Sequence, residues 1–164
     1  MEQLWAPWRL AYVAAPRPPQ EADPCFLCRG VAEADDKNNL IVQRTAASVV
    51  VLNRFPYNNG HLLIAPLAHK ATLEDLTDAE LLDLQKTLQR AKRRLDGLLK
   101  PDGYNIGLNL GAAAGAGLPG HLHGHLVPRW NGDTKFMPVL TDAKVIVQSL
   151  DTLHDLLQQT LAEP

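Results

Sequence analysis

The sequence has few of the features that mark secreted, membrane-bound or polyanion-binding proteins. Its 164 residues contain only two cysteines, and 16 basic against 18 acidic side chains give a net charge of −2. That balance supplies no broad positive field for a nucleic acid, so any anion must be bound locally. No stretch approaches the ~20 apolar residues that span a bilayer. The N-terminus lacks the basic flank and apolar run of a secretory signal, so we expect a cytoplasmic protein with no nucleic-acid or membrane partner.

The chain is long enough for one sizeable core. Its hydrophobic fraction is 46%, and no internal repeat or second composition zone divides it. We therefore expect a single domain over residues 1–164. Within it, residues 1–38 are rich in Pro, Ala and Asp with little periodicity and predict an irregular arm that packs by its tryptophans. Residues 39–164 are expected to form the sheet and helices.

Short runs of strand type follow the arm. Residues 40–43, 48–52 and 62–65 are β-branched or aliphatic, and the turn formers of residues 54–60 predict an antiparallel pair between the last two runs. Later, apolar residues alternate with amides and glycine over residues 104–110, which predicts a half-buried strand with Asn109 closing its polar face.

Two amphipathic helices are predicted. Thr77 and Glu80 form a capping box, leucines then recur at spacings of three and four as far as Leu98, and Pro101 and Gly103 end the pattern. The basic residues on its other side are read as a solvated face rather than a nucleic-acid patch. A second helix is expected over residues 149–161. Strands, a helix, strands and a helix indicate an α+β fold with an antiparallel sheet.

Histidines recur at every second position in His121-Leu122-His123-Gly124-His125. A strand would place all three imidazoles on one face, and because each needs hydrogen-bond partners, core packing explains them poorly. A neutral imidazole whose distal N–H is held by a backbone carbonyl can attack phosphorus with its other nitrogen, and the middle histidine is best placed to do so.

The loop of small residues before the histidines, 111–120, can bring backbone N–H groups close to a phosphate because its glycines carry no Cβ. It lacks the Gly-Lys-Ser/Thr ending of a P-loop, which argues against an ATPase of that type.

The only two cysteines, Cys25 and Cys28, are separated by two residues. In a reducing compartment such a pair is more typical of a metal knuckle or a redox pair than of a disulfide. Because the pair lies in a turn-like stretch and not in a thioredoxin-like strand and helix, we place metal ahead of redox. Two free cysteines remain the alternative.

Residues 121–127 follow the pattern His-φ-His-φ-His-φ-φ and resemble the histidine-triad (HIT) superfamily, with Gly124 in one apolar slot. Residues 52–56, 60–66 and 109–111 also look like HIT segments, in the right order. Residues 4–9, 127–133 and 136–138 resemble the bacterial branch related to diadenosine tetraphosphate phosphorylases. The resemblance covers nearly the whole chain. It implies a HIT-like antiparallel sheet of about five strands with a long helix and a C-terminal helix, and a homodimer.

For chemistry, the resemblance implies a two-step reaction at the α-phosphate of a dinucleoside polyphosphate or related AMP conjugate, an adenine nucleotide being the expected substrate. His123 would become nucleotidylated, and water, phosphate or another acceptor would release the nucleotide. His125 would lie beside the nucleophile, and His61 would support the triad from a neighbouring strand. The substrate-binding residues implied are Asn53, Asn109, Gly115, Ala116, Gly117, Leu118, Pro119, His125 and Trp130.

In one respect the sequence departs from the hydrolase and phosphoramidase branches. Gly117 and Leu118 stand where those branches carry Gln-Ser or Gln-Thr. A side-chain donor to the phosphate or leaving group is therefore missing, which leaves the preferred substrate open. Whether phosphate or water is the acceptor rests on Trp130 and the region around it.

Zinc-bearing members of the superfamily, like galactose-1-phosphate uridylyltransferase, resemble this chain in pairing Cys-x-x-Cys with two histidines. The matching set is Cys25, Cys28, His69 and His121. Two thiolates and two imidazoles close a tetrahedral shell, which implies structural Zn²⁺. Two other hypotheses stay open: a hydrolase in which His121 and His123 bind a catalytic metal, and a nucleotide-binding module without turnover.

Overall fold

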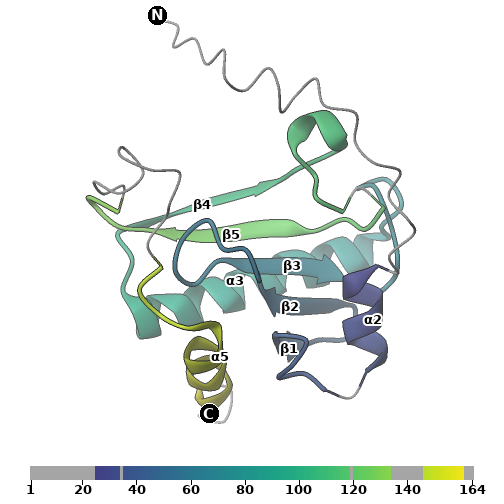
Figure 1. Cartoon of the computed structure of the whole chain (residues 1–164). Helices are drawn as coiled ribbons and strands as arrows, with labels where there is room; N and C mark the ends of the chain where they lie inside the picture. Colours follow the sequence, from purple (N-terminus) through teal and green to yellow (C-terminus); the bar gives the residue numbers. More distant parts are fainter. Residues whose placement is uncertain (1–24, 34, 119, 134–145, 161–164) are drawn as a thin grey trace, which may run out of the picture.

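The computed structural model describes residues 25–33, 35–118, 120–133 and 146–160. In these ranges five strands form one antiparallel sheet in the order β1-β2-β3-β5-β4. The elements in chain order are α2 (Phe26–Ala32), β1 (Ile41–Arg44), β2 (Ser48–Leu52), β3 (Leu62–Pro66), α3 (Asp78–Leu99), β4 (Gly103–Leu108), the 3₁₀ turn η1 (Ala112–Ala114), β5 (Gly124–Arg129) and α5 (Leu150–Gln159). Figure 1 shows the five strands side by side. The predicted α+β class, the antiparallel sheet and the two helices after residue 77 are confirmed.

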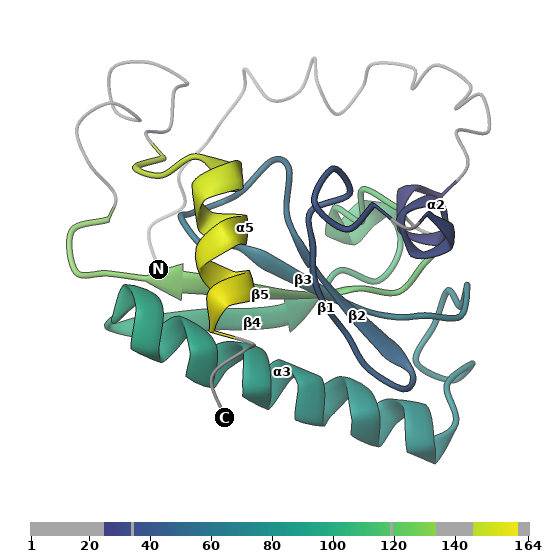
Figure 2. The same ribbon diagram turned by 90° about the horizontal axis from the view of Figure 1, so that it is seen from below.

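The register of the sheet shows which face is covered by α3 and which face carries the side chain of His125. Ile64 of β3 pairs with Gly124 of β5, and both line a hollow with Leu84 and Leu88 of α3. Because antiparallel partners point to the same face, this is the face that α3 covers. His125 lies one residue further along β5, so its side chain points to the opposite face. Figure 2 shows α3 running along the sheet with α5 crossing nearby.

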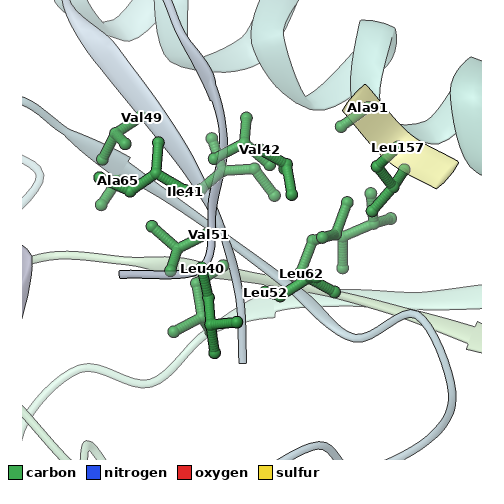
Figure 3. Packing of buried hydrophobic residues seen from close by; sticks show 14 of the residues in the cluster. Leu40, Ile41, Val42, Val49, Val51, Leu52, Leu62, Ala65, Ala91 and Leu157 are labelled. Carbon is green, nitrogen blue, oxygen red and sulfur yellow. The ribbon is translucent and has the colours of Figure 1, made fainter. Parts of the chain in front are cut away.

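Aliphatic side chains of the first three strands form the core. Their cluster is closed by Ala91 and Leu95 of α3 and by Leu153 and Leu157 of α5, all buried. Figure 3 shows Ala91 and Leu157 at one side of this cluster and Val49 and Ala65 at the other. Fully burying one such side chain contributes about 1.5–3 kcal/mol, so the core holds β3, which is central to the sheet, in a fixed position.

The capping box at the start of α3 is confirmed. The Thr77 hydroxyl accepts from the Glu80 N–H at 3.3 Å, and the Glu80 carboxylate accepts from the Thr77 N–H at 2.7 Å. Lys70 donates to the same carboxylate and is the main cause that lowers the pKa of Glu80 to about 2. The helix ends at Leu99. This helix has 22 residues. In the described ranges, however, no helix is both long and apolar enough to cross a membrane.

The prediction of an irregular arm over residues 1–38 is wrong for residues 26–32, which form α2. Cys25 caps this helix, since its Sγ accepts from the Cys28 N–H at 3.5 Å, and Leu27 and Gly30 share its buried side. The cysteine pair therefore belongs to a helix start and not to a free turn. Residues 1–24, with Trp5 and Trp8, lie outside the described residues.

Two strand predictions also need correction. The first strand begins at Ile41, because Leu40 has a left-handed φ of +57°. The strand predicted over residues 104–110 spans Gly103–Leu108, and its apolar face is not half-buried: Ile106 is 53% exposed and Leu110 is 50% exposed. The reason is position, because β4 is an edge strand and α3 leaves an open hollow beside it.

Candidate active site

The alternation predicted that the three histidines of the motif lie in one regular strand, and this prediction is wrong. β5 begins at Gly124, so only His125 is part of it. The preceding residues are held by the segment after β3 instead, where the Leu122 N–H donates to the Lys70 carbonyl at 2.7 Å. As a result the His121 ring lies against His69, with centroids 5.0 Å apart, whereas the His123 ring lies against His125 at 5.2 Å.

His121 is fully buried and fixed by a backbone carbonyl. Its Nε2 lies 2.9 Å from the carbonyl oxygen of Pro66. A carbonyl can only accept, so the proton is on Nε2 and the lone pair of the neutral ring is on Nδ1. That lone pair faces the cysteines, with Nδ1 3.2 Å from the Cys25 Sγ and 3.5 Å from the Cys28 Sγ. Burial lowers the pKa of His121, which favours this neutral form.

His123 is held by the same kind of bond, made to the opposite ring nitrogen. Its Nδ1 donates to the carbonyl oxygen of His121 at 2.8 Å. The lone pair of the neutral ring is therefore on Nε2. The side chain is only 7% exposed, and within the described ranges no protein group is hydrogen-bonded to Nε2. The geometry thus presents one nucleophilic nitrogen with a fixed direction.

A second chain of hydrogen bonds assigns the tautomers of His61 and His125. The His61 Nδ1 accepts from the Tyr57 backbone N–H at 3.0 Å and lies 3.1 Å from the Asn53 amide nitrogen. A backbone N–H can only donate, so the His61 proton is on Nε2, 2.9 Å from the His125 Nδ1. His125 accepts at Nδ1 and carries its own proton on Nε2. The outer nitrogen of His125 is therefore a hydrogen-bond donor, whereas that of His123 carries a lone pair.

Asn109 lies at the outer end of this chain. Its amide nitrogen is 3.3 Å from the His125 Nε2, which would oppose two donors. Rotating the amide by 180° presents its oxygen to the His125 proton and removes the conflict, and we adopt that orientation. Burial lowers the pKa of His125, and the repulsion that protonated His125 would meet from the neighbouring His123 ring lowers it further, so the neutral form of His125 is favoured.

The loop between β2 and β3 delivers Asn53, Tyr57 and His61 to one place. It is closed by the Asn53 N–H, which donates to the His61 carbonyl at 3.0 Å. Gly60 has a φ of +75°, and a Cβ there would lie 2.6 Å from the Leu99 side chain, so the turn into β3 requires glycine. Tyr57 was not among the site residues predicted from the sequence. The only signal was its position in the turn segment, four residues before His61.

The loop of small residues is exposed and turns at two glycines. Gly111 and Gly115 have φ values of +78° and +86°, on either side of η1. Its end reaches the histidines through the backbone, where the Leu118 carbonyl accepts from the His121 N–H at 3.3 Å. Ala116 and Gly117 belong to this loop, and Pro119 lies outside the described residues.

Trp130 is half-buried just after β5. The Trp130 backbone N–H donates to the Asp133 carboxylate at 3.1 Å, and the side-chain amide of Asn58 donates to the same carboxylate at 2.8 Å. In the described part of the chain its ring stacks on none of the histidines, so its link to them runs through Asn58 and the loop before β3.

The four residues expected to bind zinc converge. One ligand atom from each of Cys25, Cys28, His69 and His121 lies within 4.8 Å of the others, and the Cys28 Sγ is 3.2 Å from the His69 Nδ1. Zinc bonds of about 2.0–2.3 Å in a tetrahedron place ligands about 3.3–3.8 Å apart, so the cluster fits a closed shell after small adjustments. Burial and the neighbouring Cys25 raise the pKa of Cys28, so binding a cation there would release protons.

The chain is similar to known proteins over most of its length. Residues 34–132 match the model of the HIT domain. The chain is 40% identical over 161 residues to a protein of Mycobacterium tuberculosis named AP-4-A phosphorylase, an alignment that covers 96% of this chain and 83% of that protein.

Two solved structures share the fold. A zinc-bound histidine triad family protein from Mycobacterium smegmatis has a TM-score of 0.65 and 27% identity, covering 84% of this chain and 93% of that one. The NitFhit protein of C. elegans has a TM-score of 0.60 and 27% identity, covering 73% of this chain and 26% of the longer chain.

Proposed function

The chain belongs to the HIT domain family, and on that premise we propose that it is a nucleotidyl transferase or hydrolase that cleaves dinucleoside polyphosphates of the diadenosine tetraphosphate type. One observation carries the proposal: two adjacent imidazoles, 5.2 Å apart, are held in opposite roles, His123 as a nucleophile and His125 as a donor. The named activity of the M. tuberculosis relative supports this substrate class.

In the first step the Nε2 lone pair of His123 attacks the α-phosphorus. An N–P bond forms, the bond from phosphorus to the bridging oxygen breaks, and its electron pair leaves with the departing nucleotide. The imidazole becomes cationic, and its Nδ1–H stays bonded to the His121 carbonyl. A hydrogen bond to a charged group is worth about 1.5–3 kcal/mol, so this bond strengthens as the positive charge develops.

In the second step phosphate or water attacks the same phosphorus, a proton on the attacking oxygen passes to solvent, and the N–P electron pair returns to Nε2. The His125 Nε2–H, which the Asn109 oxygen accepts in the free protein, donates to a phosphate oxygen in its place in both steps and stabilises the charge that builds there. His61 holds the donor tautomer of His125, which gives it a supporting role. Asn53 is proposed to lie near the ribose, Asn109 and the backbone of residues 115–119 near the phosphates, and Trp130 near the acceptor.

Turnover of diadenosine tetraphosphate tests the function. We expect the wild-type protein to form ADP and ATP with phosphate present, or AMP and ATP without it. His123→Ala should lower kcat by at least 1,000-fold, because it removes the nucleophile while Asn53 and Asn109 remain. Product analysis by chromatography measures both. Tight AMP binding without product from any such substrate would favour a binding module instead.

We further propose that Cys25, Cys28, His69 and His121 hold structural Zn²⁺. Two thiolates and two imidazoles leave no open position, and the ion would supply a link between the start of α2 and the segments that carry His69 and His121. His121 contributes its side chain to this cluster and its carbonyl to His123. The cluster therefore stabilises the region from which the nucleophile is oriented. The zinc-bound relative from M. smegmatis supports the choice of metal.

Removal of the metal separates a structural from a catalytic role. We expect about one zinc per chain, and Cys28→Ser should lower both the zinc content and the Tm. A loss of about 10 °C or more is expected, because structural zinc contributes several kcal/mol and 1 kcal/mol corresponds to about 2–4 °C in a chain of this size. Chelation that abolished turnover and left the Tm unchanged would instead indicate a catalytic metal at His121 and His123.

We also propose a homodimer built on the open edge of β4. Ile106 and Leu108 line a hollow with Leu84 and Leu88, and an exposed apolar edge strand is a surface that proteins usually cover. Ile106→Asp should shift the sedimentation equilibrium from dimer to monomer. Val147→Asp, at a residue 75% exposed just before α5, is the matched control and should remain dimeric. A wild-type monomer would contradict the proposal.

A further inference from the structure

One aromatic side chain covers both imidazoles of the His61–His125 pair. The Tyr57 ring lies 5.6 Å from the His125 ring at an interplanar angle of 12°, and 4.6 Å from the His61 ring at 40°. The same residue donates its backbone N–H to the His61 Nδ1. Tyr57 thus contacts the pair in two ways, through its main chain in the plane of His61 and through its ring on the faces of both.

Burial does not explain this arrangement. Tyr57 is 51% exposed, so its ring is neither a core residue nor a free surface residue. Phe55, on the same loop, is 81% exposed and shows what an aromatic side chain looks like here without such contacts. The Tyr57 ring is therefore placed on the imidazoles by the geometry of the loop rather than by the core.

The hydrogen bonds of His125 leave the tilt of its ring weakly defined. The bond from the His61 Nε2 is short, at 2.9 Å, but the contact with Asn109 at the other nitrogen is 3.3 Å. A ring held firmly at one nitrogen can tilt about that bond, which would swing its Nε2–H away from a phosphate oxygen. A parallel ring on its face opposes this motion.

We propose that the Tyr57 ring is a positioning residue that fixes the plane of His125 and thereby the direction of its Nε2–H, an inference that rests on the proposed function. The ring acts through His125 and does not touch the reacting phosphate. It is the aromatic face that matters and not the hydroxyl. Phenylalanine should therefore replace tyrosine here, whereas an aliphatic side chain should not.

Three variants test this. Tyr57→Leu removes the ring, Tyr57→Phe keeps it, and Phe55→Leu removes a ring from the same loop without touching the imidazoles. We expect Tyr57→Leu to lower kcat on diadenosine tetraphosphate about tenfold with KM within about threefold, since a small displacement of a group that acts in the transition state affects kcat most. Tyr57→Phe and Phe55→Leu should stay within about twofold of wild type, by the same reasoning.

A second measurement reports on His125 without substrate. In NMR spectra, ¹³C relaxation of the ring C–H groups gives an order parameter that falls when an imidazole tilts, so the freedom of the His125 plane is read directly. The wild type and Tyr57→Phe should show a high order parameter for His125. Tyr57→Leu should show a lower one, with a Tm close to wild type and the same tautomer, since its backbone N–H still bonds to His61. Tyr57→Met is a second non-aromatic variant, read in the same way, should the leucine variant fold poorly.

Three results would each overturn the positioning role: wild-type kcat in the non-aromatic variants, a wild-type order parameter for His125 in those variants, or a loss in Tyr57→Phe equal to that in Tyr57→Leu. Failure of the proposed function looks different, because the wild-type protein itself would then make no product from diadenosine tetraphosphate. In that case the NMR comparison still decides whether the Tyr57 ring fixes His125.

Discussion

The hydrogen bond from the His123 Nδ1–H to the His121 carbonyl is the interaction on which the site depends. At 2.8 Å it settles which nitrogen of His123 bears a proton, and hence which one can attack phosphorus. The carbonyl is itself held, because the His121 side chain donates to the Pro66 carbonyl and faces Cys25 and Cys28. The cluster of two cysteines and two histidines thus shares His121 with the hydrogen bond that orients His123.

The rest of the fold delivers donors and acceptors to fixed places around that bond. α3 covers one face of the sheet and leaves the other face to His125. The loop before β3 brings Tyr57 and Asn53 to His61, which sets the tautomer of His125 from the opposite side. Two independent backbone groups, a carbonyl and an N–H, therefore produce two neighbouring imidazoles with opposite roles. No charged side chain is needed to distinguish them.

Local signals in the sequence were enough for much of this. The capping box at Thr77 placed the start of α3, and the spacing of the histidines identified the site. The predictions that were wrong or missing concern residues whose structure depends on tertiary contacts. The period-two pattern predicted a strand that includes His121. Instead, His121 and Leu122 are hydrogen-bonded to the carbonyls of Pro66 and Lys70, and β5 begins at Gly124. Tyr57 was missed because contacts between rings across a loop leave no periodicity in the sequence.

The position of the covalent bond in the trapped intermediate tests the central claim most directly. Quenching the protein during turnover of labelled diadenosine tetraphosphate and locating the label by mass spectrometry and ³¹P–¹⁵N coupling identifies the residue and its nitrogen. The account predicts a phosphoramidate on Nε2 of His123, because Nδ1 is occupied by the His121 carbonyl. A bond to Nδ1 of His123, or to any other histidine, would contradict it.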